Sequence, residues 1–226
     1  MSLAGKAVMI NWSDVPVEHR PQYYEWHDRE HIAGRVRIPG FRRGRRHIAV
    51  DADRDIFNLY EVDTLAVLTG EQYRAVADNP TEATRRAGKV IVNAIRALAH
   101  VRYSSGLGIG GNVQTLRFDA AEGAQRALSE YLIARALPAL SALPDIVGVH
   151  LCVADREAST VVTSERKGRP TAVPNWAVIV EGTSAAAVRG ATQELLPDAA
   201  LTQHGATGPV ARGTYALQIV IASGDV

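Results

Sequence analysis

The stretch YYEWHDREHIAGRVRIPGF, residues 23–41, decides the fold and holds most of the chemistry that the sequence offers. It reads as an amphipathic helix, with Pro21 suited to the first turn, where the missing proline N–H has no helical partner to lose. The helix is expected to end near Ile38, because the Pro-Gly pair after it cannot continue a helix. A strand is expected to follow over residues 41–50, with Gly44 as a bulge.

The elements around this stretch follow the order βαββαβ. Short apolar runs predict the strands, and apolar residues at helical spacing predict the helices. In this first half the predicted strands are residues 7–12, 41–50, 56–62 and 99–103, and further helix is predicted over 70–77 and 81–98.

The second half of the chain repeats this order. Pro144 to Gly148 takes the place that Pro39 to Gly44 has in the first half. The predicted strands are residues 113–118, 146–153, 176–181 and 215–221, and the predicted helices are 122–143 and 185–196.

Two diverged units therefore account for the whole chain. The first spans residues 1–105, a Gly-rich linker spans 106–111, and the second unit spans 112–226. A βαββαβ unit is the ferredoxin-like split βαβ motif, which has both helices on one face of a four-stranded sheet. The bare face of one sheet can cover that of the other, so the expected fold class is α+β, with two tandem ferredoxin-like repeats packed sheet to sheet.

The linker contains a formal G-x-G-x-x-G pattern at Gly106, Gly108 and Gly111. A dinucleotide site needs a helix directly after this pattern, so that the pyrophosphate meets the helix N-terminus. A strand is predicted to follow here instead. The pattern is therefore interpreted as a linker, and no nucleotide site is expected.

Composition is that of a soluble globular protein. Among 226 residues, 25 Lys and Arg nearly balance 24 Asp and Glu, and a net charge of +1 supplies no long-range field for nucleic acid or a membrane surface. The single cysteine, Cys152, cannot form an internal disulfide and is expected to be a buried strand residue. No run approaches the roughly 18 apolar residues that a membrane helix needs, so a cytoplasmic location is expected.

His27 and His31 lie four residues apart and share a helix face, with Asp28 three residues before His31. A nearby carboxylate favours the charged imidazolium, so the group suits a general acid or base tuned by Asp28. The alternative is a pair of solvated histidines that satisfy local hydrogen bonds. A metal site needs a third ligand, for which only His47 or Glu30 is at hand, and no metal site is expected.

The internal repeat offers a control for these histidines. When Pro39 is placed on Pro144, Trp26 falls opposite Tyr131, while His27 and His31 fall opposite Leu132 and Ala136. Both repeats have a large aromatic residue at the position of Trp26, but only the first has histidines at the positions of His27 and His31. Any active site is therefore expected in the first half.

Several other side chains are candidates for binding a substrate. Arg43, Arg45 and His47 alternate on one strand face, where guanidinium groups would suit an anionic or carbonyl-bearing substrate, or form a solvated basic edge. The remaining candidates lie on the first helix or the strands beside it: Trp26, Asn11, Tyr60 and Glu61. Trp12 and Trp176 suit an aromatic cavity or, more simply, the core. The long loop from Asp155 to Pro174, with Arg166, Lys167 and Arg169, is either a lid or a solvated insertion.

The segment Trp26-His27-Asp-Arg-Glu-His31-Ile, followed by Ile38-Pro-Gly-Phe41 and a strand, resembles the EthD-like branch of the dimeric α+β barrel superfamily. Those proteins carry a Tyr/Trp-rich helix with two histidines at this spacing and then a Pro-Gly-Phe strand entry. Their helix continues His-x-Pro, whereas Ile32 and Ala33 follow His31 here. Members usually pair two chains into a barrel, so the resemblance implies that this tandem chain forms the barrel within itself.

The resemblance also implies a pocket between helix and sheet. It implies cofactor-free isomerase, cyclase, dehydratase or monooxygenase chemistry on a small aromatic, lactone or carbonyl compound, with His27 or His31 moving a proton. Some distant relatives bind haem, which is the alternative cofactor. A non-catalytic ligand-binding or accessory protein is the alternative function, and a homodimer of the two-repeat chain is the expected form of any self-association.

Overall fold

The computed structural model describes residues 3–226, in which the strands form one closed antiparallel barrel. The order around the barrel is β1-β3-β2-β8-β5-β7-β6-β4, and β4 pairs with β1 to close it. The strands are β1 Ala7–Asp14, β2 Phe41–Ala52, β3 Ile56–Val62, β4 Val92–Gly106, β5 Asn112–Ala120, β6 Ile146–Ala154, β7 Trp176–Gly182 and β8 Ala206–Ala222.

Each half of the chain supplies four neighbouring strands of this barrel. The first half contributes β4-β1-β3-β2 and the second β8-β5-β7-β6. In each half the fourth strand is followed by the first, then the third, then the second. The halves meet at two seams, β2 with β8 and β4 with β6. The predicted fold class is confirmed: two ferredoxin-like repeats close an α+β barrel of the dimeric type within one chain.

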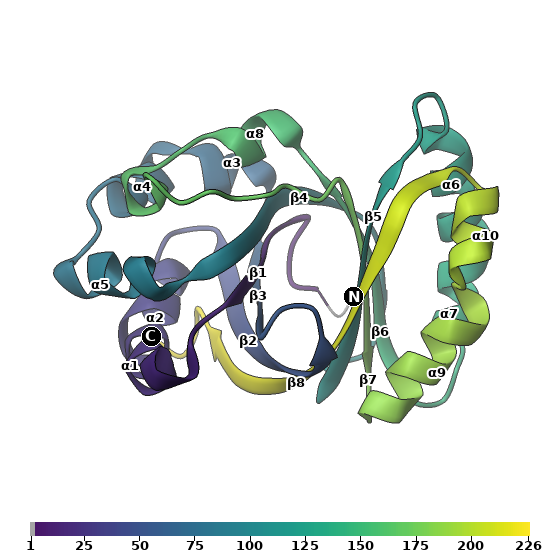
Figure 1. Ribbon diagram of the computed structural model, residues 1–226, viewed down its shortest axis with the longest axis horizontal. Coiled ribbons are helices and arrows are strands. Elements are labelled where there is room, and N and C mark those ends of the chain that lie inside the picture. The colour runs from purple at the N-terminus through teal and green to yellow at the C-terminus, as the bar shows by residue number, and fades with distance from the viewer. Residues whose placement is uncertain (1–2) are drawn as a thin grey trace.

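The helices lie outside the barrel, in one group on each side (Figure 1). The first group is α1 Arg20–Trp26, a π-helical turn His27–His31, α2 Ile32–Val36, α3 Leu65–Thr69, α4 Glu71–Ala77 and α5 Glu82–Val90. The second group is α6 Gln125–Tyr131, a π-helical turn Leu132–Ala136, α7 Leu137–Ser141, α9 Ala185–Leu195 and α10 Asp198–Gln203. The loop after β6 carries α8 Arg156–Thr160 and a 3₁₀ turn Ser164–Arg166, and another 3₁₀ turn, Val17–His19, precedes α1. No helix within residues 3–226 is long and apolar enough to cross a membrane.

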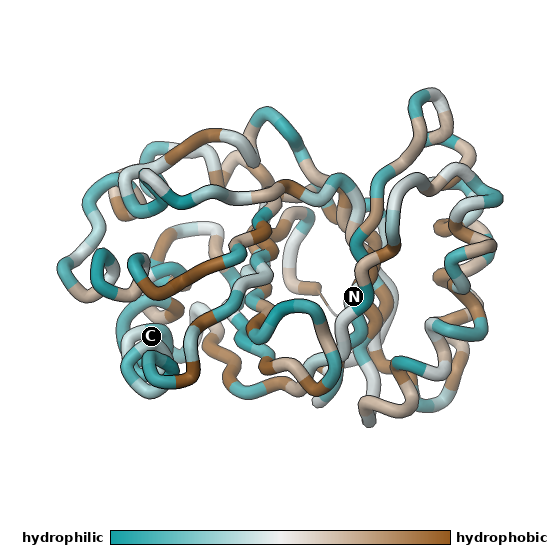
Figure 2. The backbone as a smooth tube through the Cα atoms, in the orientation of Figure 1, coloured by the Kyte–Doolittle hydropathy of each residue, from teal (hydrophilic) through white to brown (hydrophobic). Residues whose placement is uncertain are grey.

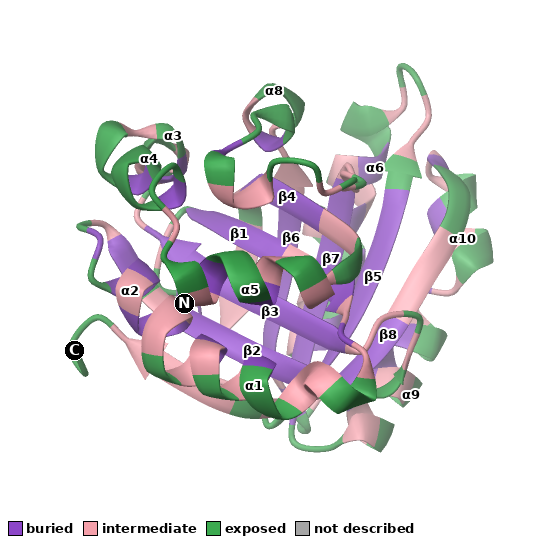
Figure 3. Ribbon diagram, turned by 60° about the vertical axis from the view of Figure 1, so that its left-hand side comes forward, coloured by how far each residue is buried: buried purple, intermediate pink, exposed green. Residues whose placement is uncertain are grey.

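The barrel interior and the layers beneath the helices form separate cores. Trp12, Phe57 and Tyr215 pack inside the barrel, and Cys152 is buried there on β6, where burial raises the pKa of its thiol to about 12. Hydrophobic residues recur along the strands (Figure 2), and β3 and β7 are buried at every residue, as expected when both faces of a strand are covered. Figure 3 shows strands buried along most of their length and exposed outer turns on α1 and α5.

Three sequence-based boundaries were wrong. The helix predicted over 81–98 ends at Val90, and β4 runs from Val92 to Gly106, so only 107–111 remain as the connection between the halves. The last strand also begins earlier than predicted, at Ala206. Gly44 pairs regularly with Tyr60, and the bulge lies between Phe41 and Arg43 instead.

Candidate functional site

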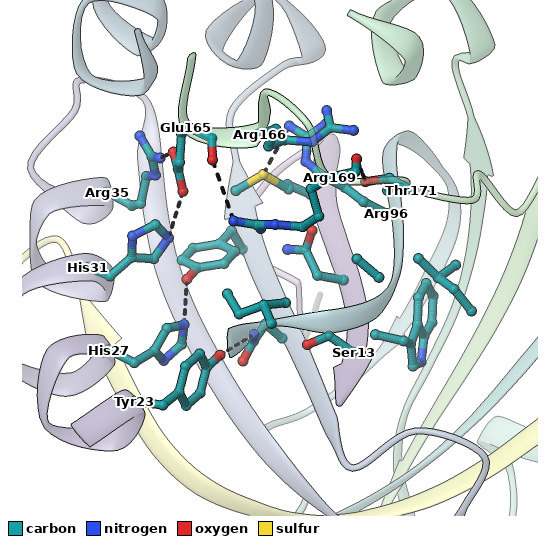
Figure 4. Close-up of a pocket in the computed structure, with 18 of the residues that line it drawn as sticks. Ser13, Tyr23, His27, His31, Arg35, Arg96, Glu165, Arg166, Arg169 and Thr171 are labelled. Atoms are coloured by element: carbon teal, nitrogen blue, oxygen red, sulfur yellow. Dashed lines mark hydrogen bonds and ion pairs between the residues drawn. The ribbon is translucent and has the colours of Figure 1, made fainter. Parts of the chain in front are cut away.

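A cavity of about 80 Å³ lies between the helices of the first half, the outer face of its sheet and the long loop after β6 (Figure 4). The helices contribute Tyr23, Trp26, His27, His31, Arg35 and Tyr73. The strands contribute Met9, Asn11, Trp12, Ser13, Asn58, Tyr60, Ala94, Ile95 and Arg96. Glu165, Arg166, Arg169 and Thr171 come from the loop, and Ile91 completes the lining.

The two histidines are placed by a π-helical turn. His27 and His31 are its first and last residues, and their rings stack with centroids 5.5 Å apart. Trp26 packs on His31 with centroids 4.4 Å apart. π-turns within α-helices often occur at functional sites, but the second half has one at Leu132–Ala136 as well. The turn therefore belongs to the fold, and the histidines are particular to the first half.

His27 is held between a strand arginine and a tyrosine. Arg46 Nη1 lies 3.1 Å from His27 Nδ1, and Tyr60 Oη lies 3.0 Å from His27 Nε2. A guanidinium can only donate, so Nδ1 must accept and Nε2 must carry the hydrogen and donate to Tyr60. Burial, His31 and Arg46 all lower the pKa of His27 well below its usual value. His27 is therefore neutral, with both ring nitrogens occupied.

The Tyr60 hydroxyl keeps its own hydrogen as a consequence. It accepts from His27, so its O–H is left to donate to another group. Burial raises the pKa of Tyr60 well above its usual value, so the phenol stays protonated. Tyr60 can thus stabilise a negative oxygen in the cavity as a hydrogen-bond donor.

His31 is the histidine with a proton-accepting nitrogen available. Its Nε2 lies 3.8 Å from Glu165 Oε1, which is too long for a hydrogen bond. Burial, Arg35 and Arg169 lower the pKa of His31 well below its usual value, so the resting ring is neutral. A neutral imidazole beside a carboxylate can accept a proton and have the resulting charge balanced.

Arg35 holds that carboxylate in place. Its guanidinium forms an ion pair and a hydrogen bond with Glu165 and lies over the Tyr73 ring, 5.0 Å from the centroid. Burial lowers the pKa of Arg35, but the charge and hydrogen bond of Glu165, together with Tyr73 and Tyr60, more than offset this and the pKa is raised. The pair fixes the loop residue Glu165 against α2, so the loop closes over His31.

The structure brings together Asn11, Trp26, His27, His31 and Tyr60 of the residues expected at a site. Asp28 does not tune either histidine as expected, since its carboxylate pairs with Arg46 and the carboxylate beside His31 is Glu165.

The expected strand residues Arg43, Arg45, His47 and Glu61 do not line this cavity. Arg43, Arg45 and His47 on β2 and Glu61 on β3 lie on the face of the sheet that points into the barrel, where Arg45 pairs with Glu61 at 2.9 Å and Arg43 pairs with Glu61 at 2.6 Å. His47 Nδ1 donates to the Phe57 carbonyl at 3.2 Å. Trp176 packs in the core of the second half, while Trp12 lies at one edge of the cavity.

The loop residues and Arg35 and Arg96 were missed as site residues. The cationic character of the 155–174 loop was the one signal in the sequence, and its position over the pocket depends on contacts between residues far apart in the chain. Among residues 3–226, no group of three or more His, Cys, Asp or Glu side chains could hold a metal ion. His27 cannot ligate haem iron, because both of its ring nitrogens are engaged.

No protein-family model matches the sequence, and no curated protein is significantly similar to it. Among solved structures, an anthrone oxidase-like protein superposes with a TM-score of 0.70 at 14% identity, over 100% of this chain and 98% of that one. The chain has the dimeric α+β barrel fold.

Two more proteins with this fold are candidate monooxygenases. One, from Lactobacillus acidophilus, has a TM-score of 0.61 at 9% identity and covers 97% of each chain. The other, from Fusobacterium nucleatum, has a TM-score of 0.60 at 10% identity, over 97% of this chain and 96% of that one. At these identities the likeness describes the fold of the α+β barrel and not its chemistry.

Proposed function

We propose that this α+β barrel is a small-molecule enzyme that moves a proton on a carbonyl or phenolic compound without a cofactor. The observation that carries the proposal is a neutral His31 and a hydrogen-donating Tyr60 in the lining of one cavity. A base and an oxyanion donor are the two groups that proton abstraction next to a carbonyl requires.

In this mechanism His31 removes a proton from a carbon that is next to the carbonyl or conjugated with it through an aromatic ring. The negative charge that develops on the substrate oxygen is stabilised by the Tyr60 hydroxyl, which His27 orients. Glu165 balances the charge of the protonated His31, a role that the sequence had suggested for Asp28. His27 is a positioning residue, because both of its nitrogens are engaged.

The resulting carbanion or enolate is common to several reaction classes. Returning the proton to another carbon gives an isomerase, expelling a leaving group gives a dehydratase, and reaction with dioxygen gives a cofactor-free monooxygenase. The fold shared with an anthrone oxidase-like protein and two candidate monooxygenases supports the last of these. The Trp26-to-Phe41 pattern supports membership of the EthD-like branch.

Proton abstraction can be tested without knowing the physiological substrate. Anthrone, a ketone whose acidic CH₂ group lies across the central ring from the carbonyl and whose anion carries its charge on that oxygen, is incubated with the protein in D₂O without air, and hydrogen exchange is followed by NMR. We expect exchange above the buffer rate, a decrease of about 10²- to 10⁴-fold in His31→Gln, and a smaller decrease in Tyr60→Phe. His204→Gln, a change in the second half where His204 stacks on Tyr131, is the matched control.

Two results would contradict the proposal that this protein is an enzyme. Equal exchange in wild type and His31→Gln would remove the base from the mechanism. Binding of anthrone with no exchange above the buffer rate would instead identify a ligand-binding protein.

A further inference from the structure

Three arginines on one side of the cavity lack an acidic partner. Arg96 comes from β4, and Arg166 and Arg169 come from the loop that covers the pocket (Figure 4). Within the described residues none of the three forms an ion pair with Asp or Glu, because the one carboxylate of the lining, on Glu165, is bound by Arg35. The cavity therefore carries a positive charge that the protein itself does not balance.

Burial makes this arrangement costly without a ligand. Arg96 is only 6% exposed, and while its Nη2 donates to Tyr73 Oη at 3.2 Å, its Nη1 is buried without a hydrogen-bond partner in the described chain. The same holds for Arg169 Nε. Buried donors left unsatisfied destabilise the fold, and more so when they belong to a charged group.

The arginines also act on one another. Burial and the charge of Arg96 lower the pKa of Arg166 to about 10, with Arg169 adding to the effect. Burial likewise lowers the pKa of Arg169. Like charges held together in this way favour an anion bound among them.

A wider groove leads from the surface to this cluster. Its volume is about 1000 Å³, and it adjoins the inner cavity, with which it shares Arg169, Thr171 and Ile95. Its other charged side chains, apart from Glu165, are cationic: Arg54, Arg85, Lys89 and Lys167. A groove lined by one sign of charge concentrates ions of the opposite sign at its inner end.

We propose that the pocket binds an aromatic oxyanion, a carboxylate or a phosphate monoester, with its charged group on Arg96, Arg166 and Arg169, and that the basic groove is its route of entry. The aromatic part fits the remaining wall, where Trp26 and Tyr60 lie beside His31 and Tyr23 lies beside His27. This inference rests on the proposed function of the same pocket and names its substrate class.

Isothermal titration calorimetry with three probes of similar shape tests the proposal. Benzoate and phenyl phosphate carry the anion, and benzamide is the neutral match. At low ionic strength we expect at least one anion to bind about tenfold more tightly than benzamide, equivalent to about 1.4 kcal/mol. The preference should decrease at high salt, and the stronger of the two anions identifies the headgroup.

Variants locate the anion. Arg166→Gln and Arg96→Gln are each expected to weaken the preferred anion by about tenfold or more and to leave benzamide unchanged. Arg126→Gln removes the same charge from the surface of α6, where Arg126 faces Glu130, and should leave all three affinities unchanged. Circular dichroism shows whether Arg96→Gln is folded, and the more exposed Arg166 gives an independent second variant.

Equal binding of the three probes, no binding of either anion, or anion binding that survives both arginine changes would overturn the proposal. The outcome is separable from that for proton transfer, because anthrone is neutral. His31→Gln should lose exchange but keep the preference for an anion, whereas Arg166→Gln should lose the preference. His31-dependent exchange without any anion preference would leave the enzyme standing and remove only the substrate class.

Discussion

Three histidines of the first half are neutral in the folded chain, and two of them, His27 and His47, are buried. Burial and neighbouring charge lower the pKa of His27 and His31 well below the usual value, and burial and Arg45 lower that of His47 to about 3. The unfolded chain binds protons at these sites near pH 6.5, while the folded chain does not. Each site therefore stabilises the fold fully above pH 6.5, and this contribution is lost as the pH falls toward the folded pKa.

His47 allows this effect to be measured apart from the active site. Its Nδ1 donates to Phe57 O, and its Nε2 is buried without a partner among the described residues, so protonation would add an unsatisfied donor. At about 1.4 kcal/mol per pH unit, lowering the pH from 6.5 to 5 should cost the wild type about 2 kcal/mol through this residue alone. Urea unfolding at the two pH values should show a loss smaller by that amount in His47→Asn. Equal losses in the two proteins would mean that His47 is already protonated in the fold.

Local sequence predicted which helix carries the histidines but not their partners. The four-residue spacing of His27 and His31 survives in a π-turn, because both rings still stack on one face. Asp28 is adjacent in sequence, yet its carboxylate is bound by Arg46 from β2. Glu165 lies more than a hundred residues away from His31 in the chain and reaches it only after the loop folds over the pocket, so no spacing rule could select it.

At the scale of elements, the pocket depends on how closely α2 sits on β2. A Cβ added at Gly44 would lie 2.6 Å from Ile32 Cγ2 and 3.1 Å from the Tyr60 ring. Ile32 and Tyr60 are fully buried, so neither can easily move away. The absence of a side chain at Gly44 thus sets the distance between the histidine helix and the sheet.

Gly44→Ala is expected to destabilise the protein by about 1–3 kcal/mol and to slow anthrone exchange, because it pushes α2 and His31 away from Tyr60. Gly34→Ala on α2 itself is the matched control. A Cβ at Gly34 meets no atom within 4 Å, and alanine is favoured over glycine in a helix by roughly 0.5–1 kcal/mol. Urea midpoints should therefore move in opposite directions for the two variants. A Gly44→Ala protein as stable and active as wild type would show that the helix can shift freely.

The helix predicted over 81–98 runs into what is the start of β4, because the spacing of apolar residues there fits a helix as well as a strand. Residues 92–98 follow a real helix, α5, and contain alanine and leucine, so the helical pattern was extended through them. In the barrel they pair with β1, with Ala97 opposite Ile10 and Arg96 opposite Asn11. Ala97 faces the barrel core and Arg96 the pocket, an arrangement that tertiary pairing determines and local propensity does not.

At the scale of the whole molecule, two seams and one buried ion network join the repeats. β2 pairs with β8, and β4 pairs with β6. Inside the barrel Arg45 joins Glu61 of the first repeat, at 2.9 Å, to Glu181 of the second, at 2.8 Å. Burial raises the pKa of Glu181, but the charges and hydrogen bonds of Arg45 and His150 together lower it by more. The net pKa is lowered, so the carboxylate stays charged. The order of strands and helices in each repeat could be predicted from the sequence. The ion network could not, because it joins residues far apart in the chain, and Arg45 was predicted to bind a substrate instead.

Because these contacts cross between the repeats, the covalent connection at 107–111 should be dispensable once the barrel has formed. A protease site inserted after Gly108 suits the test, since Leu107 is fully exposed and a Cβ at Gly108 meets no atom within 4 Å. After cleavage we expect one particle with the elution volume of the uncut protein. Arg45→Met leaves two buried carboxylates without their shared cation, at a cost of about 3–5 kcal/mol, so the cleaved variant should separate at a lower urea concentration than the cleaved parent. Two half-sized fragments in native buffer would show that the 107–111 connection, rather than the seams and Arg45, keeps the barrel closed.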